Sequence, residues 1–235
     1  MSYRSHHFHL KESAALPLEH VMTHAHRGYL PAAGLDLLLP FYDPLLRLFG
    51  ADRLRQRLFD LASVQAHHRV LDIGCGTGTF AVALKRSLPP LWLVGLDPDP
   101  KAIARSRRKA QRAGVSIRFD LGFAELLPYP DASFDRVFSC LMFHHLPREA
   151  KLRTLQEVRR VLKCGGSLHL LDLERAPSAR SGLFARWSHS SDQMRDNSRE
   201  QILKWLLEAG LVPILQSSDQ SIFGKVLHLA ARSDG

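Results

Sequence analysis

The stretch RVLDIGCGTGTF, residues 69–80, places the strongest constraint on the fold of this 235-residue chain. Apolar residues run into Asp72, glycines then occupy three alternate positions, and a helical pattern follows. Glycines let a chain turn tightly with positive φ and let a ligand come close to the backbone. A strand, a glycine-rich turn and a helix in this order are typical of α/β proteins that bind nucleotides. The sequence therefore predicts a nucleotide site directly after this strand.

The following part of the chain alternates between short apolar runs and amphipathic segments. The predicted strands cover residues 70–74, 91–97, 115–121, 134–141 and 167–173, and the predicted helices cover 77–88, 100–114 and 148–162. Strands that alternate with crossover helices form a parallel sheet with helices on both faces. We therefore expect an α/β fold with a doubly wound, Rossmann-like, mostly parallel sheet.

The C-terminal part follows a different pattern. A helix is expected over residues 198–210, with Asn197 or Ser198 as its cap and Gly210 at its end. Residues 211–218 and 225–233 then form two apolar segments with no room for a helix between them. Such a short connection joins strands antiparallel, so the sheet is expected to end in an antiparallel hairpin.

Two segments lie outside this alternation. Residues 1–66, with two or three short helices broken by prolines, are expected to form a leader and an N-terminal helical lid on a main domain of residues 67–235. The main domain contains an insertion at residues 174–197, which includes Phe184 and Trp187. Because ligands bind at the carboxyl ends of the strands in such sheets, both segments are candidates to cover a partly hydrophobic pocket.

Composition limits the class of protein. No apolar run reaches the about 20 uninterrupted residues that span a membrane, and residues 1–13 lack the apolar core of a signal peptide. The three cysteines are odd in number and far apart, which suits a reducing compartment, so we expect a cytoplasmic protein. Six of the 13 histidines fall in residues 6–26, but no cysteine or acidic pair joins them, and no metal site is predicted.

The net charge of +9 raises the question of an anionic partner. Residues 67–175 hold 18 Lys and Arg against 11 Asp and Glu, many of the basic ones in segments 101–112 and 148–163. Both segments are predicted helices, and the expected fold puts them on opposite faces of the sheet. One continuous basic stripe is therefore not expected, and neither is a nucleic-acid partner. Peripheral contact with an anionic membrane stays an alternative.

The turn after the first strand discriminates between nucleotides. Its three glycines are Gly74, Gly76 and Gly78. Dinucleotide sites have the spacing G-x-G-x-x-G, whose third glycine would stand at Thr79. Asp72 would repel a pyrophosphate, but it would attract a ligand that carries an ammonium and a sulfonium. Asp97 ends the second predicted strand about 20 residues further on, where an acidic side chain can accept hydrogen bonds from ribose hydroxyls.

Five segments in the same order resemble the motifs of class I S-adenosylmethionine-dependent methyltransferases. They are VLDIGCGTG, LVGLDPDP, AELLPYPDASFDRVFSC, LMFHHLP and LQEVRRVLKCGGSLHLLDL, all within residues 69–175. Their order and spacing are similar to those of ubiquinone/menaquinone C-methyltransferases and bacterial phospholipid N-methyltransferases. The resemblance implies S-adenosyl-L-methionine as cofactor, S-adenosyl-L-homocysteine as product, and a hairpin-ended sheet.

The resemblance also implies which residues bind the methionine part of the cofactor. Asp72, Gly74 and Gly76 would hold it, in a loop that also contains Cys75 and Gly78. Cys75 is common at this place in the turn and needs no redox role.

On the adenosine side, the resemblance implies that Asp97 holds the ribose and that Pro98 lies against the adenine. Ala124 would offer its backbone N–H to the adenine ring. Phe123 stands where the family usually has Asp or Asn, which reaches the adenine amino group. Phe123 would either stack on the adenine at the loss of one hydrogen bond, or weaken cofactor binding.

Methyl transfer from a sulfonium is an in-line displacement, so alignment can supply most of the catalysis. Cys140 and Leu141 would line the transfer site. A base is needed only where the acceptor must lose a proton. Of the two adjacent histidines, we prefer His145 to His144 as the candidate for the base or for a substrate contact. Its alternative role is a structural hydrogen bond. Tyr42 resembles the tyrosine that caps the site in the quinone subgroup, and its alternative is a packed aromatic.

The leading functional hypothesis is methyl transfer to a small, hydrophobic or amphipathic acceptor, such as a quinone precursor, an amino-lipid or a small thiol. From a different class, the chain could be a non-catalytic regulatory protein that binds S-adenosylmethionine, a hypothesis that Phe123 alone favours. An NAD-dependent oxidoreductase is a third hypothesis, and the glycine spacing and Asp72 argue against it.

Overall fold

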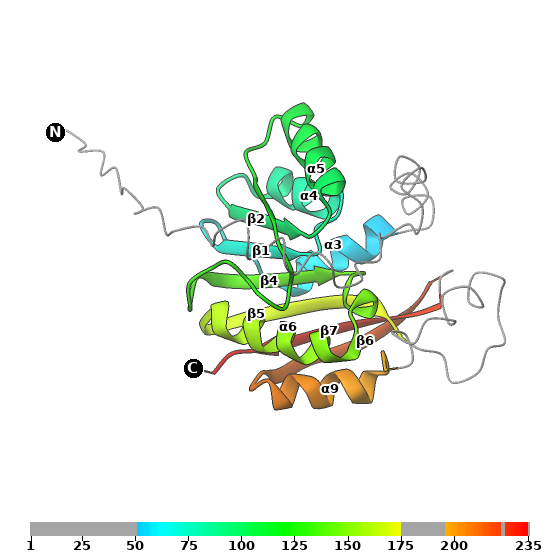
Figure 1. Cartoon of the computed structure of the whole chain (residues 1–235). Helices are drawn as coiled ribbons and strands as arrows, with labels where there is room; N and C mark the ends of the chain where they lie inside the picture. Colours follow the sequence, from blue (N-terminus) through cyan, green and yellow to red (C-terminus); the bar gives the residue numbers. More distant parts are fainter. Residues whose placement is uncertain (1–50, 175–195, 222–223, 235) are drawn as a thin grey trace.

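The computed structural model describes residues 51–174, 196–221 and 224–234, and in these residues helices lie on both faces of one sheet (Figure 1). The sheet has seven strands in the order β3-β2-β1-β4-β5-β7-β6. The strands are β1 (Arg69–Ile73), β2 (Trp92–Asp97), β3 (Arg118–Leu121), β4 (Phe134–Cys140), β5 (Leu162–Leu173), β6 (Val212–Ser221) and β7 (Gly224–Arg232). The helices are α3 (Ala51–Leu61), α4 (Thr79–Ser87), α5 (Pro100–Arg112), α6 (Arg148–Val161) and α9 (Arg199–Glu208), with a 3₁₀ turn η2 (Phe143–His145).

The strand pairing confirms the predicted fold. Strand β1 pairs in parallel with β2 and β4, while β2 pairs with β3 and β4 with β5, also in parallel. Strand β7 pairs antiparallel with both β5 and β6, which forms the predicted hairpin end. The strand order reverses between β1 and β4, and ligands of such sheets bind outside the carboxyl ends of the strands at this point.

Two strands start three or more residues away from the predicted position. Strand β3 starts at Arg118 rather than at residue 115, because the preceding residues close helix α5. Gly114 has φ 66, and the Val115 N–H donates to the Ala110 carbonyl at 3.1 Å, which is how a helix commonly ends. Strand β5 starts at Leu162 rather than at residue 167, since α6 runs into it without a loop.

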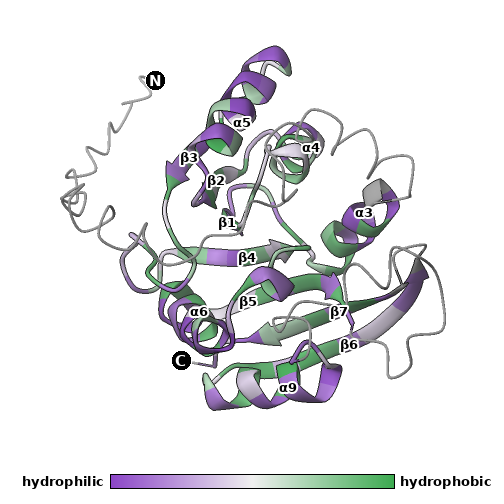
Figure 2. Cartoon of the chain, turned by 45° about the vertical axis from the view of Figure 1, so that its right-hand side comes forward, coloured by the Kyte–Doolittle hydropathy of each residue, from purple (hydrophilic) through white to green (hydrophobic). Residues whose placement is uncertain are grey.

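The core has one layer on each face of the sheet. Leu71 and Ile73 of β1 belong to the cluster that contains α6 and α9, whereas Val70 belongs to the cluster that contains α3, α4 and α5. This alternation is the period of two expected of a strand. The basic helices α5 and α6 therefore lie on opposite faces, as predicted. Figure 2 shows apolar residues along the strands and many polar residues on the helices.

Parallel pairing brings the carboxyl ends of the strands to one edge of the sheet. Asp72 lies near the end of β1, Asp97 ends β2, Cys140 ends β4, and Asp172 lies near the end of β5. Residues that are 25 to 100 positions apart in the sequence are thereby collected at the predicted site.

The turn between β1 and α4 needs its glycines for different reasons. Gly76 has φ 54 and Gly78 has φ 75. A Cβ on Gly78 would come within 2.7 Å of the Ser106 Cβ in α5, whereas a Cβ on Gly76 would meet nothing within 4 Å. Gly78 therefore lets α5 pack against the turn, while Gly76 leaves open space beside it.

We expect Gly78→Ala to destabilise the protein more than Gly76→Ala. Both substitutions put an alanine at positive φ, at a cost of about 1–2 kcal/mol. Only the first adds a steric conflict with α5, which costs about 1–3 kcal/mol more. Urea unfolding of the two variants measures the difference. Equal losses of stability would contradict the assigned role of Gly78.

Candidate active site

The Asp97 carboxylate joins the glycine turn to the start of helix α5. Its Oδ2 accepts the Gly76 N–H at 2.8 Å, and its Oδ1 accepts the Asp99 N–H at 2.9 Å. Burial raises the pKa of Asp97 to about 6, and the two backbone N–H groups oppose this rise. A carboxylate oxygen can accept more than one hydrogen bond, so Asp97 retains acceptor capacity for ribose hydroxyls.

Asp72 lies near the end of β1 and is almost fully buried. Its Oδ2 atom has no hydrogen-bond partner among the residues that the structure describes. Burial raises the pKa of Asp72 to about 8, which the Arg55 guanidinium opposes and Asp97 reinforces. A buried carboxylate that lacks partners is costly, and a cationic ligand removes that cost. Asp72 therefore fits the ammonium group of the methionine moiety.

The backbone around Asp72 leaves room for a ligand on one side. A Cβ on Gly76 would have no other atom within 4 Å, so the space beside this residue is open. A Cβ on Gly74, in contrast, would come within 2.1 Å of the Met142 Cγ. Met142 therefore lies over Gly74 and forms part of the wall, although sequence reasoning did not single it out. Leu141 precedes it with φ 55, a left-handed conformation that costs about 1–3 kcal/mol in a residue other than glycine.

The loop after β3 lies beside Asp97, as the predicted adenine-binding role requires. The Gly122 N–H donates to the Asp97 carbonyl at 3.2 Å, and the next two residues are half-buried Phe123 and buried Ala124. Pro98, which is half-buried, follows Asp97 directly. The structure thus brings the four predicted adenosine residues together, and their contacts with the cofactor stay predictions.

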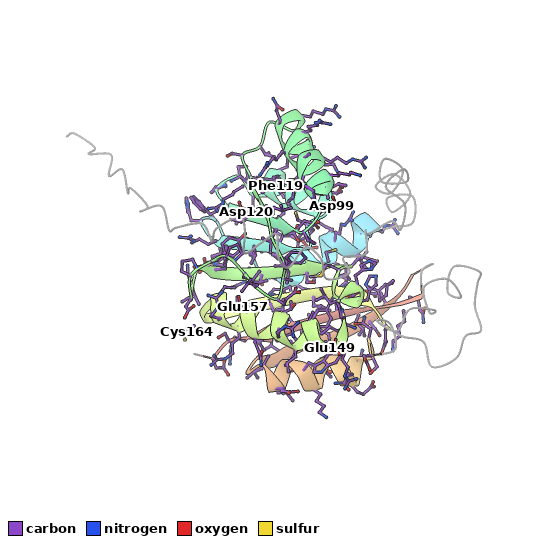
Figure 3. All side chains as sticks on the ribbon, in the orientation of Figure 1. Asp99, Phe119, Asp120, Glu149, Glu157 and Cys164 are labelled. Carbon is purple, nitrogen blue, oxygen red and sulfur yellow. The ribbon has the colours of Figure 1, made fainter. Side chains whose placement is uncertain are left out.

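Polar contacts hold this loop in place. The Tyr129 hydroxyl donates to Asp120 Oδ2 at 3.1 Å, and Glu157 Oε2 accepts the Leu127 N–H at 2.8 Å. Figure 3 marks Asp120 with Phe119 on β3, Asp99 near helix α5, and Glu157 on α6. The loop is therefore fixed to both β3 and α6.

The thiols at the site are neutral. Cys140 is half-buried at the end of β4, and burial raises its pKa to about 11. Burial also raises the pKa of Cys75 well above its usual value. Neither sulfur is therefore a nucleophile at neutral pH, which agrees with direct in-line transfer.

Asp172, near the end of β5, makes a hydrogen-bonded pair with His144. The carboxylate is fully buried, its Oδ2 accepts the His144 backbone N–H at 2.8 Å, and its Oδ1 contacts the His144 Nδ1. The Leu173 N–H also donates to Oδ1, at 2.7 Å. This arrangement places the Nδ1 proton toward Asp172 and makes Nε2 the basic nitrogen of His144.

His145, our sequence-based candidate for the base, lies directly against His144, with 4.0 Å between the ring centroids. Burial, reinforced by the neighbouring His144, lowers the pKa of His145 to about 3. The ring is neutral at physiological pH, but it is a weak proton acceptor. The geometry therefore favours His144 over His145 as the base.

Sequence reasoning missed Asp172 and Arg55. The signal for Asp172 was present, because an acidic residue near the end of an apolar strand is also what singled out Asp72 and Asp97. Arg55 lies before the first strand, and no motif around it in the sequence indicates a function. Tyr42, Phe184 and Trp187 lie outside the described residues, so their roles stay predictions.

Comparison with known proteins agrees with this geometry. A family model described as a methyltransferase domain matches residues 70–166. The demethylmenaquinone methyltransferase of Thermus thermophilus is 41% identical over 152 residues, which cover 63% of this chain and 68% of that protein. The chain belongs to the class I S-adenosylmethionine-dependent methyltransferases.

Other similar proteins extend this result. The demethylmenaquinone methyltransferase of Deinococcus radiodurans is 42% identical over 151 residues, which cover 63% of this chain and only 60% of that protein. The crystal structure of the YcgJ protein from Bacillus subtilis superposes with a TM-score of 0.64 at 22% identity, over 77% of this chain and 98% of that one, which shows the common fold. The methyltransferase uses S-adenosylmethionine as its cofactor, and neither the NAD-dependent nor the non-catalytic hypothesis is favoured.

We expect cofactor binding at pH 7 to release close to one proton through Asp72. With a pKa of about 8, Asp72 is mostly protonated in the ligand-free protein, and the cofactor ammonium requires the ionised form. Calorimetric titration in buffers of different ionisation enthalpy measures the number of protons released. Asp72→Asn should release none and should bind the cofactor about 10- to 100-fold more weakly.

A stability measurement provides the control for this prediction. Since the folded-state pKa of Asp72 is raised, the protonated form favours folding, and this contribution is lost as the pH rises from about 4 to about 8. Ligand-free Asp72→Asn should therefore be at least as stable as the wild type at pH 8. A strong loss of stability in this variant would show that Asp72 has a structural role instead.

Proposed function

We propose that this methyltransferase methylates a small, hydrophobic or amphipathic aromatic acceptor of the quinol type. The observation that carries the proposal is the Asp172–His144 pair near the end of β5, since a base in this place suits an acceptor that must lose a hydroxyl proton. The names of the Thermus and Deinococcus relatives support a quinone-type acceptor for this chain as well. An amino-lipid and a small thiol are the alternative acceptors.

The residues of the chain have distinct tasks in the proposed reaction. The cofactor, when bound, supplies a methyl group activated by a positively charged sulfur. Asp72 and the glycine turn position the methionine moiety, and Asp97 positions the ribose. His144 Nε2 would accept the acceptor's hydroxyl proton as electron density moves from oxygen to the attacking atom, which takes the methyl group while neutral S-adenosylhomocysteine leaves. Where the attacking atom is a ring carbon, that carbon then loses its own proton and the ring becomes aromatic again. Asp172 keeps the Nδ1–H of His144 in place and stabilises the imidazolium that forms.

The segments around the sheet would shape the acceptor pocket. We propose that residues 1–66 form a leader and lid, and that residues 174–197 form an insertion over the main domain of residues 67–235. Helix α3, which lies in the first segment, supports this proposal because its Leu58 is buried in the same apolar cluster as Phe138 of β4 and Leu171 of β5. Tyr42 and Trp187 are our candidates for contacts with the acceptor.

We expect His144→Asn to slow methyl transfer to a reduced demethylmenaquinone by about 10²- to 10⁴-fold, the usual contribution of a general base. Transfer of labelled methyl from the cofactor into the organic phase measures turnover, and calorimetry shows whether cofactor affinity is retained. His67→Asn is the matched control, because His67 is exposed and has φ 67, a conformation that asparagine tolerates.

Turnover of the His144→Asn and His145→Asn variants shows which of the two histidines is the base. If His145→Asn removes turnover while His144→Asn does not, His145 is the base and the proposed role of the Asp172–His144 pair is wrong. Label that is found only in polar metabolites would overturn the hydrophobic acceptor.

We further propose that the acceptor is met at an anionic membrane surface. Among the described residues, no helix has the length and the apolar character needed to cross a membrane. Helix α5 carries six Lys and Arg and no acidic residue. Its exposed cations are Lys101, Arg107, Arg108 and Arg112. Such a helix face is attracted to anionic lipid headgroups by about 1 kcal/mol for each basic residue near the surface.

We expect the protein to sediment with vesicles that contain phosphatidylglycerol, and to be released by salt. Replacing Arg108 and Arg112 with Gln should weaken this binding about 10- to 30-fold. Replacing the exposed Arg153 and Lys204 with Gln, on the opposite side of the sheet, is the control with the same change of charge. If both double variants weaken vesicle binding equally, or if the protein binds RNA more tightly than vesicles, membrane docking by α5 is contradicted.

A further inference from the structure

Helix α6 carries a fully buried lysine close to the proposed base. Lys151 is 0% exposed, and among the buried residues that the structure describes it is the only lysine or arginine. Its ammonium lies 5.7 Å from the ring centroid of Phe143 in η2 and 5.6 Å from that of Trp205 in α9, the helix that packs beside α6 (Figure 1). A lysine is almost never fully buried unless an opposite charge accompanies it.

The opposite charge is the Asp172 carboxylate, which is also fully buried. Burial lowers the pKa of Lys151 to about 8, and Asp172 is the first of the charges that oppose this fall. The ammonium is therefore still mostly protonated at pH 7. Asp196 and Arg148 also act on Lys151, but in opposite directions, and they form an ion pair with each other at 2.8 Å.

Asn197 connects the ammonium to the end of β5. This buried amide accepts a hydrogen bond from Lys151 Nζ on its Oδ1 at 3.3 Å, and its Nδ2 donates to the Leu173 carbonyl. The Leu173 N–H in turn donates to Asp172 Oδ1 at 2.7 Å. Lys151 and Asp172 therefore belong to one hydrogen-bonded unit, which ends at the His144 ring.

The unit contains one group that can be negative and two that can be positive, because the His144 ring can also take up a proton. We propose, building on the proposed role of His144 as the base, that Lys151 is a positioning residue which supplies the countercharge of Asp172 and so keeps the His144 ring neutral. Without the ammonium, the carboxylate would have only the ring as a source of positive charge. The Asp172–His144 pair would then take up a proton before the acceptor arrives.

The other titratable groups on the neighbouring elements do not supply this charge. His145 of η2 faces His144, but burial lowers its pKa to about 3, so its ring stays neutral. The Cys140 thiol at the end of β4, on which Asp172 acts, is neutral because burial raises its pKa to about 11. Helix α9 contributes the uncharged Trp205 ring. In the described part of the chain, Lys151 is thus the buried ammonium that can neutralise Asp172.

The protonation of the pair can be measured on the full chain without any methyl acceptor. In protein with ¹³C-labelled histidine rings, the His144 signal is the one that disappears in His144→Asn. In Lys151→Met, the pH midpoint at which this ring takes up its proton should rise by about 1–3 units, the usual effect of one close charge. Lys151→Gln should raise it equally, because glutamine keeps a donor for Asn197 but has no charge. Lys151→Arg keeps the charge and should restore most of the shift.

The pH dependence of methyl transfer to a reduced demethylmenaquinone is the second measurement. The acid limb of the profile should move to higher pH in Lys151→Met by the same number of units, so that turnover on this limb falls about 10-fold for each unit. Affinity for S-adenosylmethionine, measured by calorimetry, should be unchanged. Thr154→Val is the matched control, because Thr154 is fully buried on the same helix and the substitution changes no charge. Both profiles of this control should match the wild type.

Two results would overturn the proposal. If Lys151→Met and Lys151→Gln leave the His144 midpoint unchanged, Lys151 is not the countercharge, even where turnover or stability is lost. If only Lys151→Met raises the midpoint, the hydrogen bond to Asn197 and not the charge controls the ring. Should Lys151→Met fail to fold, Lys151→Gln alone decides. A raised midpoint in both variants supports the countercharge even if methyl transfer proves independent of His144, so a failure of the proposed base is distinguishable from a failure of this inference.

Discussion

The hydrogen bond from the Gly76 N–H to the Asp97 carboxylate connects the two turns from which the cofactor site is built. The same carboxylate accepts the N–H of Asp99, and Asp99 in turn caps the first turn of α5. Further along α5, Lys109 returns to the two threonines of the glycine turn, with hydrogen bonds of 3.0 and 2.5 Å. The close approach that Gly78 allows keeps these contacts short. The strand ends, the turn and α5 are therefore placed as one unit.

Three buried carboxylates at this edge of the sheet have different partners, and the partner determines the role of each. Asp97 is held by backbone N–H groups and has lone pairs left for a ribose. Asp172 is held by backbone N–H groups and by the His144 ring. Asp72 has the Arg55 guanidinium nearby and one oxygen without a hydrogen-bond partner in the described part of the chain, so its burial is costly until a cation arrives. In the ligand-free protein the raised pKa keeps Asp72 mostly protonated at pH 7, and we expect the cofactor ammonium to let it ionise.

Local patterns in the sequence were enough to predict the fold, whereas most cofactor residues were assigned from the resemblance to methyltransferase motifs and stay predictions. Strand and helix periods are local, and the glycine turn requires positive φ at particular positions, so both could be read along the chain. Asp72 and Asp97 could be assigned because each lies at a strand end next to a turn. The predicted start of β3 at residue 115 was wrong, because residues 115–117 also fit a strand pattern but follow directly on the end of helix α5. The sequence singled out His145 and not His144, because it does not show that the Asp172 carboxylate lies against the His144 ring. Which of the two histidines is the base stays a prediction.

By itself, the sequence determined the parallel sheet, the nucleotide site at its edge and the class of cofactor, since these follow from residue types at short spacing. Only the tertiary structure decided which distant groups meet at that edge. The pairing of β4 with β5 places Asp172 against His144, 28 residues away. The packing of α3 on the sheet brings Arg55 close enough to act electrostatically on Asp72. The physical reason is that such contacts depend on strand order and on side-chain packing over the whole domain, which no local pattern encodes.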